Sequence, residues 1–192
     1  MKKVWIAFFG VLLILGCMHI ERVHNNIKDS VIRLHILANS NDYYDQKIKL
    51  DVRDFVLENY GASLSADNKE EALEKIYKNL PKMLKDIASV SGQEVKIGIS
   101  ESSFPTKSYN GFSLPKGKYL ALKIELGEGK GNNWWCVMYP PLCFEQGAFV
   151  SDLKKLKKVL SEDEYKLITE KKGVTLYKFK AVEIWNSIAN KF

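Results

Sequence analysis

The sequence predicts an α+β fold, with a single domain in which about four mostly antiparallel strands form a sheet covered by helices. Four short segments alternate apolar and polar residues, as half-buried strands do, and several longer segments repeat apolar residues at helical spacing. A chain of 192 residues with 46% hydrophobic residues can fill one core of roughly 150–170 residues. We therefore expect one domain over residues 31–192, preceded by a targeting segment over 1–20 and a polar connector over 21–30.

The N-terminus has the pattern of a secretory signal peptide or a membrane anchor. Lys2 and Lys3 precede a run from Val4 to Met18 that is almost wholly apolar. The run is shorter than the ~20 residues that comfortably span a bilayer, so cleavage and retention as an anchor both stay open. Cys17 lies in a stretch that resembles a lipoprotein processing site, which makes lipidation a third option. These three options place the rest of the chain outside the cytosol, and a buried helix of a cytosolic protein is the remaining alternative.

The first half of the predicted domain contains a strand and two helices. Apolar residues alternate with Arg33 and His35 over residues 31–38, which indicates a strand. A turn then leads to a helix over 43–60, with Gly61 as its stop signal. A second helix begins at Asn68, where Glu71 can complete a capping box.

Pro81 lies inside the apolar stripe of that second helix and should kink it or divide it in two.

The period then changes to that of strands. Segments over 95–99, 119–126 and 134–139 have strand character, and the glycine-rich segment Gly127–Gly131 separates the last two. We therefore expect a hairpin over 119–139, with glycines that adopt positive φ in its turn. A phosphate-binding loop is the alternative, but the segment lacks the required Gly-x4-Gly-Lys-Ser/Thr spacing.

The C-terminal part is predicted to be helical. Ser151 and Ser161 are plausible N-caps, and Glu164 would complete a capping box with the second. The aromatic stripe over 179–192 predicts a last amphipathic helix, which packs on the core or lies on a membrane surface.

The net charge of +6 does not by itself indicate a nucleic-acid partner, and we expect none. The basic excess is spread along the chain, with one cluster over 154–158, and neither an arginine-rich stripe nor zinc-finger spacing accompanies it. Outside a cell, a basic protein meets anionic lipids and wall polymers, which accounts for the charge equally well.

The segment with Trp134, Trp135, Cys136 and Cys143 is the densest group of unusual residues. Export to an oxidising compartment predicts a disulfide between the two cysteines, since nearby thiols usually pair there. A redox or metal site is the alternative, but Cys-x6-Cys is not its usual spacing. In a strand the two tryptophans point to opposite faces, so one of them should contact a partner or cover another part of the protein.

A polar network is expected where Arg33 and His35, on one strand face, meet Asp42 and Asp45 at the start of the next helix. Acid–base chemistry or a metal site is the alternative, but no nucleophile–base set or zinc-binding helix accompanies these residues. We therefore expect no catalytic residues, no metal and no cofactor.

Several separated blocks of the sequence also carry a family resemblance. They are Arg33–Ser40, the spacing from Asp45-Gln46 to Lys49-x3-Arg53-Asp54, Phe104–Lys107, Gly127–Phe144 and Tyr177–Glu183. Together they closely resemble the stage II sporulation protein R family of endospore-forming bacteria. The resemblance implies a signalling protein, made in the forespore and exported into the space between the forespore and mother-cell membranes. There it would activate a membrane-embedded aspartic protease of the mother cell, which processes the pro-form of a sigma factor.

We hypothesise that the disulfide-fixed loop is the anchor for the protease, because rigid aromatic and proline side chains lose little entropy on docking. The anchor residues would be Trp134 or Trp135, Tyr139, Pro140 and Pro141, with Lys130 and Asn133 at the edge. Two alternatives stay open: an exported cell-wall hydrolase with carboxylates near Arg33, His35 and Asp45, and a passive envelope lipoprotein.

Overall fold

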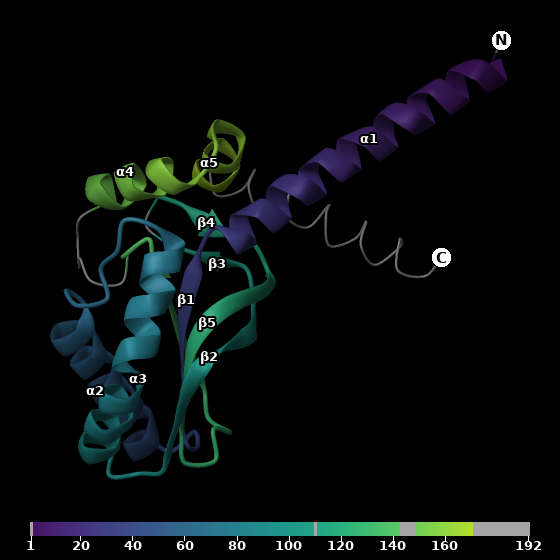
Figure 1. The fold of residues 1–192 in the computed structure, drawn as a ribbon. Helices are drawn as coiled ribbons and strands as arrows, with labels where there is room; N and C mark the ends of the chain where they lie inside the picture. Colours follow the sequence, from purple (N-terminus) through teal and green to yellow (C-terminus); the bar gives the residue numbers. More distant parts are fainter. Residues whose placement is uncertain (1, 110, 143–148, 171–192) are drawn as a thin grey trace.

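The computed structural model describes residues 2–109, 111–142 and 149–170, which form a single α+β domain with a mixed four-stranded sheet (Figure 1). In chain order the elements are α1 (Lys2–Asp29), β1 (Ile32–Leu37), α2 (Tyr43–Tyr60), α3 (Lys69–Ser91), β2 (Val95–Phe104), β3 (Lys107–Ser108), β4 (Ser113–Leu114), β5 (Gly117–Leu126), β6 (Asn133–Tyr139), α4 (Phe149–Val159) and α5 (Glu162–Thr169). The predicted fold class is confirmed.

The sheet has the strand order β2-β5-β1-β6, with β3 and β4 as a separate two-stranded pair. Strand β1 pairs in parallel with β5 and antiparallel with β6, and β2 pairs antiparallel with β5. The hairpin predicted over 119–139 is therefore wrong, because β1 lies between the two strands. The connection from β5 to β6 instead crosses the carboxyl end of β1, where the Lys130 and Gly131 amides donate to the carbonyls of Asn39 and Ala38.

Helices α2 and α3 cover one face of the sheet (Figure 1). The apolar side chains of β1 on this face, Ile32, Leu34 and Ile36, are fully buried against them, which confirms the alternation expected for the first strand. Helix α2 has the predicted bounds, and α3 runs through Pro81 without a break, so a division into two helices is wrong. Proline removes only one backbone hydrogen bond, and the flanking turns are anchored by buried residues on both sides.

The second face of the sheet is covered by the end of α1, by α4 and α5, and by the β3–β4 pair. Residues 21–29, predicted as a polar connector, continue α1, and Ile27 of this segment is fully buried in the second core. Leu114 of β4 and Ile168 of α5 are also fully buried there. The domain is therefore a sheet between two apolar layers.

The helix ends follow local capping chemistry. Ser161 and Glu164 form the predicted capping box at the start of α5. Asn68 accepts a hydrogen bond from the Glu71 amide at the start of α3, whereas the Glu71 carboxylate accepts from the Asp67 amide, so the box is only half formed. Helix α4 begins at Phe149, two residues before the predicted cap Ser151. The stripe predicted over 179–192 lies outside the described residues.

Helix α1 extends away from the sheet and exposes large apolar side chains (Figure 1). Trp5, Phe8, Leu15 and Met18 are each more than half exposed. Among the residues that the structure describes, no helix has the length and apolar character needed to cross a membrane.

Candidate functional site

Strand β6 lies at one edge of the sheet and carries both adjacent tryptophans. In the register with β1, Trp134 pairs with Ile36 and Trp135 pairs with His35. Trp134 packs against the core under α2 and α3, and Trp135 packs against the core on the other face. The prediction of opposite faces is confirmed, but neither ring points freely outward, since both side chains are half-buried.

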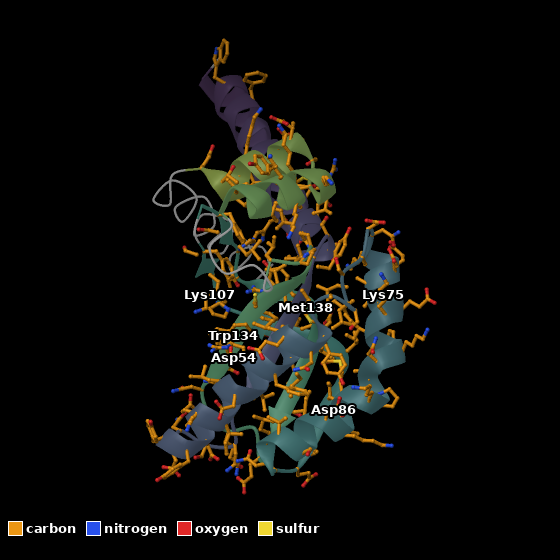
Figure 2. All side chains as sticks on the ribbon, turned by 90° about the vertical axis from the view of Figure 1, so that its left-hand side faces the viewer. Asp54, Lys75, Asp86, Lys107, Trp134 and Met138 are labelled. Carbon is orange, nitrogen blue, oxygen red and sulfur yellow. The ribbon has the colours of Figure 1, made fainter. Side chains whose placement is uncertain are left out.

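A cation lies over each tryptophan ring. The guanidinium carbon of Arg53, on α2, is 5.6 Å from the ring centre of Trp134. The ammonium nitrogen of Lys107, on β3, is 4.9 Å from the ring centre of Trp135. At these distances the positive charge interacts favourably with the face of the ring. Each face of strand β6 therefore carries an aromatic ring with a positive charge over it. Figure 2 labels Lys107 and Trp134 among the side chains of this region.

Asp54 fixes the position of the Arg53 guanidinium. Two parallel hydrogen bonds of 2.7 and 2.8 Å run from Arg53 to the Asp54 carboxylate. Hydrogen bonding to this guanidinium holds the pKa of Asp54 below its usual value. The pair is partly exposed and anchors the cation above Trp134.

We name the surface formed by Trp134, Arg53, Trp135 and Lys107 the β6 clamp. Sequence reasoning did not assign Arg53 and Lys107 to this site, although both lie in blocks that carry the family resemblance. Their role depends on α2 and β3 meeting β6 in three dimensions, and no local spacing signals that. An aromatic pair on an edge strand with a cation on each side is suited to binding a protein surface, because tryptophan and arginine are the residues most enriched among strong interface contacts.

The remaining members of the predicted anchor do not form one exposed loop. Tyr139 is 6% exposed and its hydroxyl donates to the carbonyl of Asp67, and Pro140, which follows a cis peptide bond, is also buried. Placing these two residues at the docking surface is therefore wrong, because the end of β6 turns into the core instead of toward solvent. Pro141 is half-buried, and its carbonyl accepts a hydrogen bond from Lys155.

The two residues predicted at the edge of the anchor are exposed. Lys130 forms an ion pair with Glu128. The amide oxygen of Asn133 is 2.6 Å from Nε2 of His35. Two glycines of the preceding turn, Gly127 and Gly129, have the predicted positive φ.

Two of the three cysteines, Cys17 and Cys136, lie within the described residues. Cys136 is buried and disulfide-bonded. Cys143 lies outside the described residues, so the pairing of these two cysteines stays a prediction. Cys17 belongs to helix α1, and its side chain is not among those described.

The four residues predicted as one polar network are divided between two places. Arg33 and His35 share the face of β1 that points away from α2, and Arg33 donates to Tyr109 and to the carbonyl of Cys136. Asp45 instead accepts from Asn39 and Gln93. Hydrogen bonding to Ser40 in the first place, and then to Asn39 and Gln93, lowers the pKa of Asp45.

Asp42 is exposed at the N-cap position of α2 and makes no side-chain capping bond. The predicted network is wrong because of the alternation of side chains along β1. Arg33 and His35 lie on the same face of the strand, and that face points away from α2, at whose N-terminal end the two aspartates lie.

The described residues offer no evident site for metal chemistry. Within 2–109, 111–142 and 149–170, no group of three His, Cys, Asp or Glu side chains is placed to hold a metal ion. What the β6 clamp offers chemically is non-covalent recognition through apolar area and positive charge.

Comparison with known proteins gives two matches. The family model described as stage II sporulation protein R (spore_II_R) matches residues 28–148, more than half of the chain. Stage II sporulation protein R of Bacillus subtilis (strain 168) is 41% identical over an alignment of 125 residues, and the alignment covers 62% of this chain and 55% of that protein. The match thus spans about half the length of this curated relative. No solved structure matches the chain significantly.

Proposed function

Because the chain belongs to the stage II sporulation protein R family, we propose that it is an exported sporulation signal that binds and activates a membrane-embedded aspartic protease of the mother cell. The activated protease would process the pro-form of a sigma factor. The protein would act in the space between the forespore and mother-cell membranes, either secreted or held by its N-terminal segment.

One observation carries the assignment of a binding role: the β6 clamp presents aromatic and positively charged groups on both faces of an edge strand. Such a surface can bury apolar area at its centre and steer an acidic partner through its charges. The family is named for sporulation and not for an enzymatic reaction, which supports a signalling role.

Activation requires more than tight binding. A ligand shifts a conformational equilibrium only by its difference in affinity for the two states, so the clamp would have to bind the active protease better than the inactive one. A tenfold preference corresponds to about 1.4 kcal/mol, which one or two contacts of this kind can supply.

The exported hydrolase is not favoured by the structure. That alternative needs carboxylates near Arg33, His35 and Asp45, and the hydrogen bonds of Asp45 run to Asn39 and Gln93 instead. No specific observation supports the passive lipoprotein.

A charge reversal at the clamp tests the proposal in sporulating cells. Lys107→Glu replaces the cation over Trp135 with an anion, and Lys118→Glu is the matched control because Lys118 lies in β5, exposed and on a part of the sheet that does not contact β6. We expect Lys107→Glu to reduce sigma-factor processing at least about tenfold, as the loss of one central interface contact does. Processing should stay normal in Lys118→Glu, and both variants should be exported and melt like the parent protein. Normal processing in Lys107→Glu would remove the clamp from the mechanism.

A further inference from the structure

Arg33 is an arginine at the centre of the sheet whose side chain is fully buried (0% exposed). Aromatic rings surround its guanidinium carbon, which lies 4.0 Å from the ring centre of Phe104, 5.0 Å from that of Tyr119 and 6.0 Å from that of Tyr109. The charge is thus held in a predominantly apolar environment, and burial lowers the pKa of Arg33.

Within the described residues, the hydrogen-bond partners of this guanidinium are neutral. Nη2 donates to the hydroxyl of Tyr109, and Nε donates to the carbonyl of Cys136 at 3.3 Å. Nη1 is buried and has no hydrogen-bond partner in the part of the chain that the structure describes. In the described part of the chain, no ion pair involves Arg33.

A second buried donor without a partner lies beside the same ring of Phe104. The ring centre of Trp135 is 6.4 Å from that of Phe104. The indole Nε1–H of Trp135 makes no hydrogen bond to any of the residues described. Two buried N–H donors that lack a partner among the described residues, one of them charged, therefore lie near the same ring of Phe104, one from β1 and one from β6.

This arrangement is costly for the folded protein. A buried donor left unpaired loses its hydrogen bond to water without replacement, and a buried charge without a counter-ion is more unfavourable still. A carboxylate removes both costs, because it carries the opposite charge and two coplanar acceptor oxygens that match the edge of a guanidinium. A phosphate carries more charge and would pay a larger desolvation cost among three aromatic rings.

We propose that Arg33 and Trp135 form a binding site for a carboxylate. One carboxylate oxygen accepts from Nη1 of Arg33, and the other accepts from Nη2 in place of the Tyr109 hydroxyl, with the indole of Trp135 as a further donor to the carboxylate. The site does not depend on the proposed protease partner.

Tyr109 and Phe112 control access to this site. Their rings stack 4.8 Å apart. Tyr109 directly follows β3 and Phe112 directly precedes β4, and each of these strands is only two residues long. A carboxylate reaches Arg33 when the Tyr109 ring moves aside, so the hydroxyl of Tyr109 and the ligand compete for the same donor.

The direct test uses the purified full-length chain and follows the indole N–H signal of Trp135 by NMR. Sodium acetate is titrated against sodium chloride at equal ionic strength. We expect a saturable shift with acetate alone. Arg33→Met should weaken the acetate response at least about tenfold, the effect of losing one charge-assisted hydrogen bond. Arg22→Met is the matched control, because Arg22 is exposed on α1, and it should leave the response unchanged.

Tyr109→Phe gives an independent test with the opposite sign. It keeps the ring and removes the competing hydroxyl, so acetate should bind about threefold to tenfold more tightly. This variant keeps the proposal falsifiable even if Arg33→Met does not fold. Weaker or unchanged binding in Tyr109→Phe would contradict the competition for Nη2 and overturn the site.

The source of the carboxylate is distinguished by two further probes, acetyl-glutamate amide and acetyl-glutamine amide. Binding of the glutamate compound and not of the glutamine compound indicates the side chain of a polypeptide, whereas binding of acetate alone indicates a small free acid. If neither carboxylate differs from chloride, the two donors hold solvent only and the proposal is wrong.

Discussion

The connection from β5 to β6 gives a sharp quantitative prediction, because its glycines are needed for different physical reasons. A Cβ added at Gly131 would lie 2.1 Å from the carbonyl oxygen of Ser40, although the φ of Gly131 is not positive. Gly129 has a φ of +62° but its nearest contact would be an ordinary 3.5 Å. At Gly98 there is neither a contact within 4 Å nor a positive φ.

These geometries predict the order of destabilisation on substitution by alanine. The methyl group of Gly131→Ala would collide with the Ser40 carbonyl, so the backbone at residue 131 must shift. This shift weakens the hydrogen bond from the amide of residue 131 to the carbonyl of Ala38. Overpacking and the weakened hydrogen bond together should cost about 2–4 kcal/mol. Gly129→Ala places a Cβ in the left-handed region and costs about 1–2 kcal/mol. Gly98→Ala should be neutral or stabilise by up to about 1 kcal/mol, since alanine loses less entropy than glycine on folding.

Urea denaturation followed by circular dichroism measures these differences from the transition midpoints at a common slope. A free energy of unfolding for Gly131→Ala within about 0.5 kcal/mol of the parent protein would refute the reasoning, since surface substitutions without a steric cause fall in that range. A cost at Gly98 as large as that at Gly131 would refute it as well.

Three further predictions concern single positions. Burial lowers the pKa of His24 to about 4, and the nearby charge of Lys28 adds to the effect, so the unfolded chain takes up the proton at a higher pH than the folded protein does. The free energy of unfolding should therefore fall by up to about 1.4 kcal/mol per pH unit as the pH drops from about 6.5 toward 4. His24→Leu should flatten this slope in denaturation curves measured at several pH values. Ser161→Ala removes the capping box of α5 and should cost about 1 kcal/mol in the same assay, whereas no change would show that the box contributes nothing. Pro81→Ala restores the missing amide inside α3 at an exposed position and should raise the free energy of unfolding by about 1–3 kcal/mol, and a decrease would contradict this account.

The local elements of this fold follow from the sequence, whereas the order of the strands does not. The polar turn before Tyr43 and the glycine after Tyr60 bound helix α2 where the structure has it. The glycines after β5 indicate that the chain reverses direction, but they do not reveal that β1 lies between the strands on either side. The parallel pairing of β1 with β5 joins segments far apart in the chain, and apolar alternation is the same for every possible neighbour.

The candidate site shows the same division between local and long-range information. Strand alternation predicts that Trp134 and Trp135 face opposite ways, and the structure confirms it. The positions of Arg53 and Lys107 over the two rings depend on where α2 and β3 pack, and no spacing near the tryptophans encodes that. The burial of Tyr139 is equally non-local, since its hydroxyl reaches the loop before α3.

Reconstitution from purified components would show whether the protein activates a protease. The aspartic protease that we propose as the partner and its proposed pro-sigma substrate are placed together in lipid vesicles, and the purified chain is added on the side that would correspond to the intermembrane space. We expect cleavage of the substrate to depend on the added chain and to be lost with Lys107→Glu but not with Lys118→Glu. Cleavage that proceeds equally without the chain, or that does not occur when the parent chain is present, would contradict it.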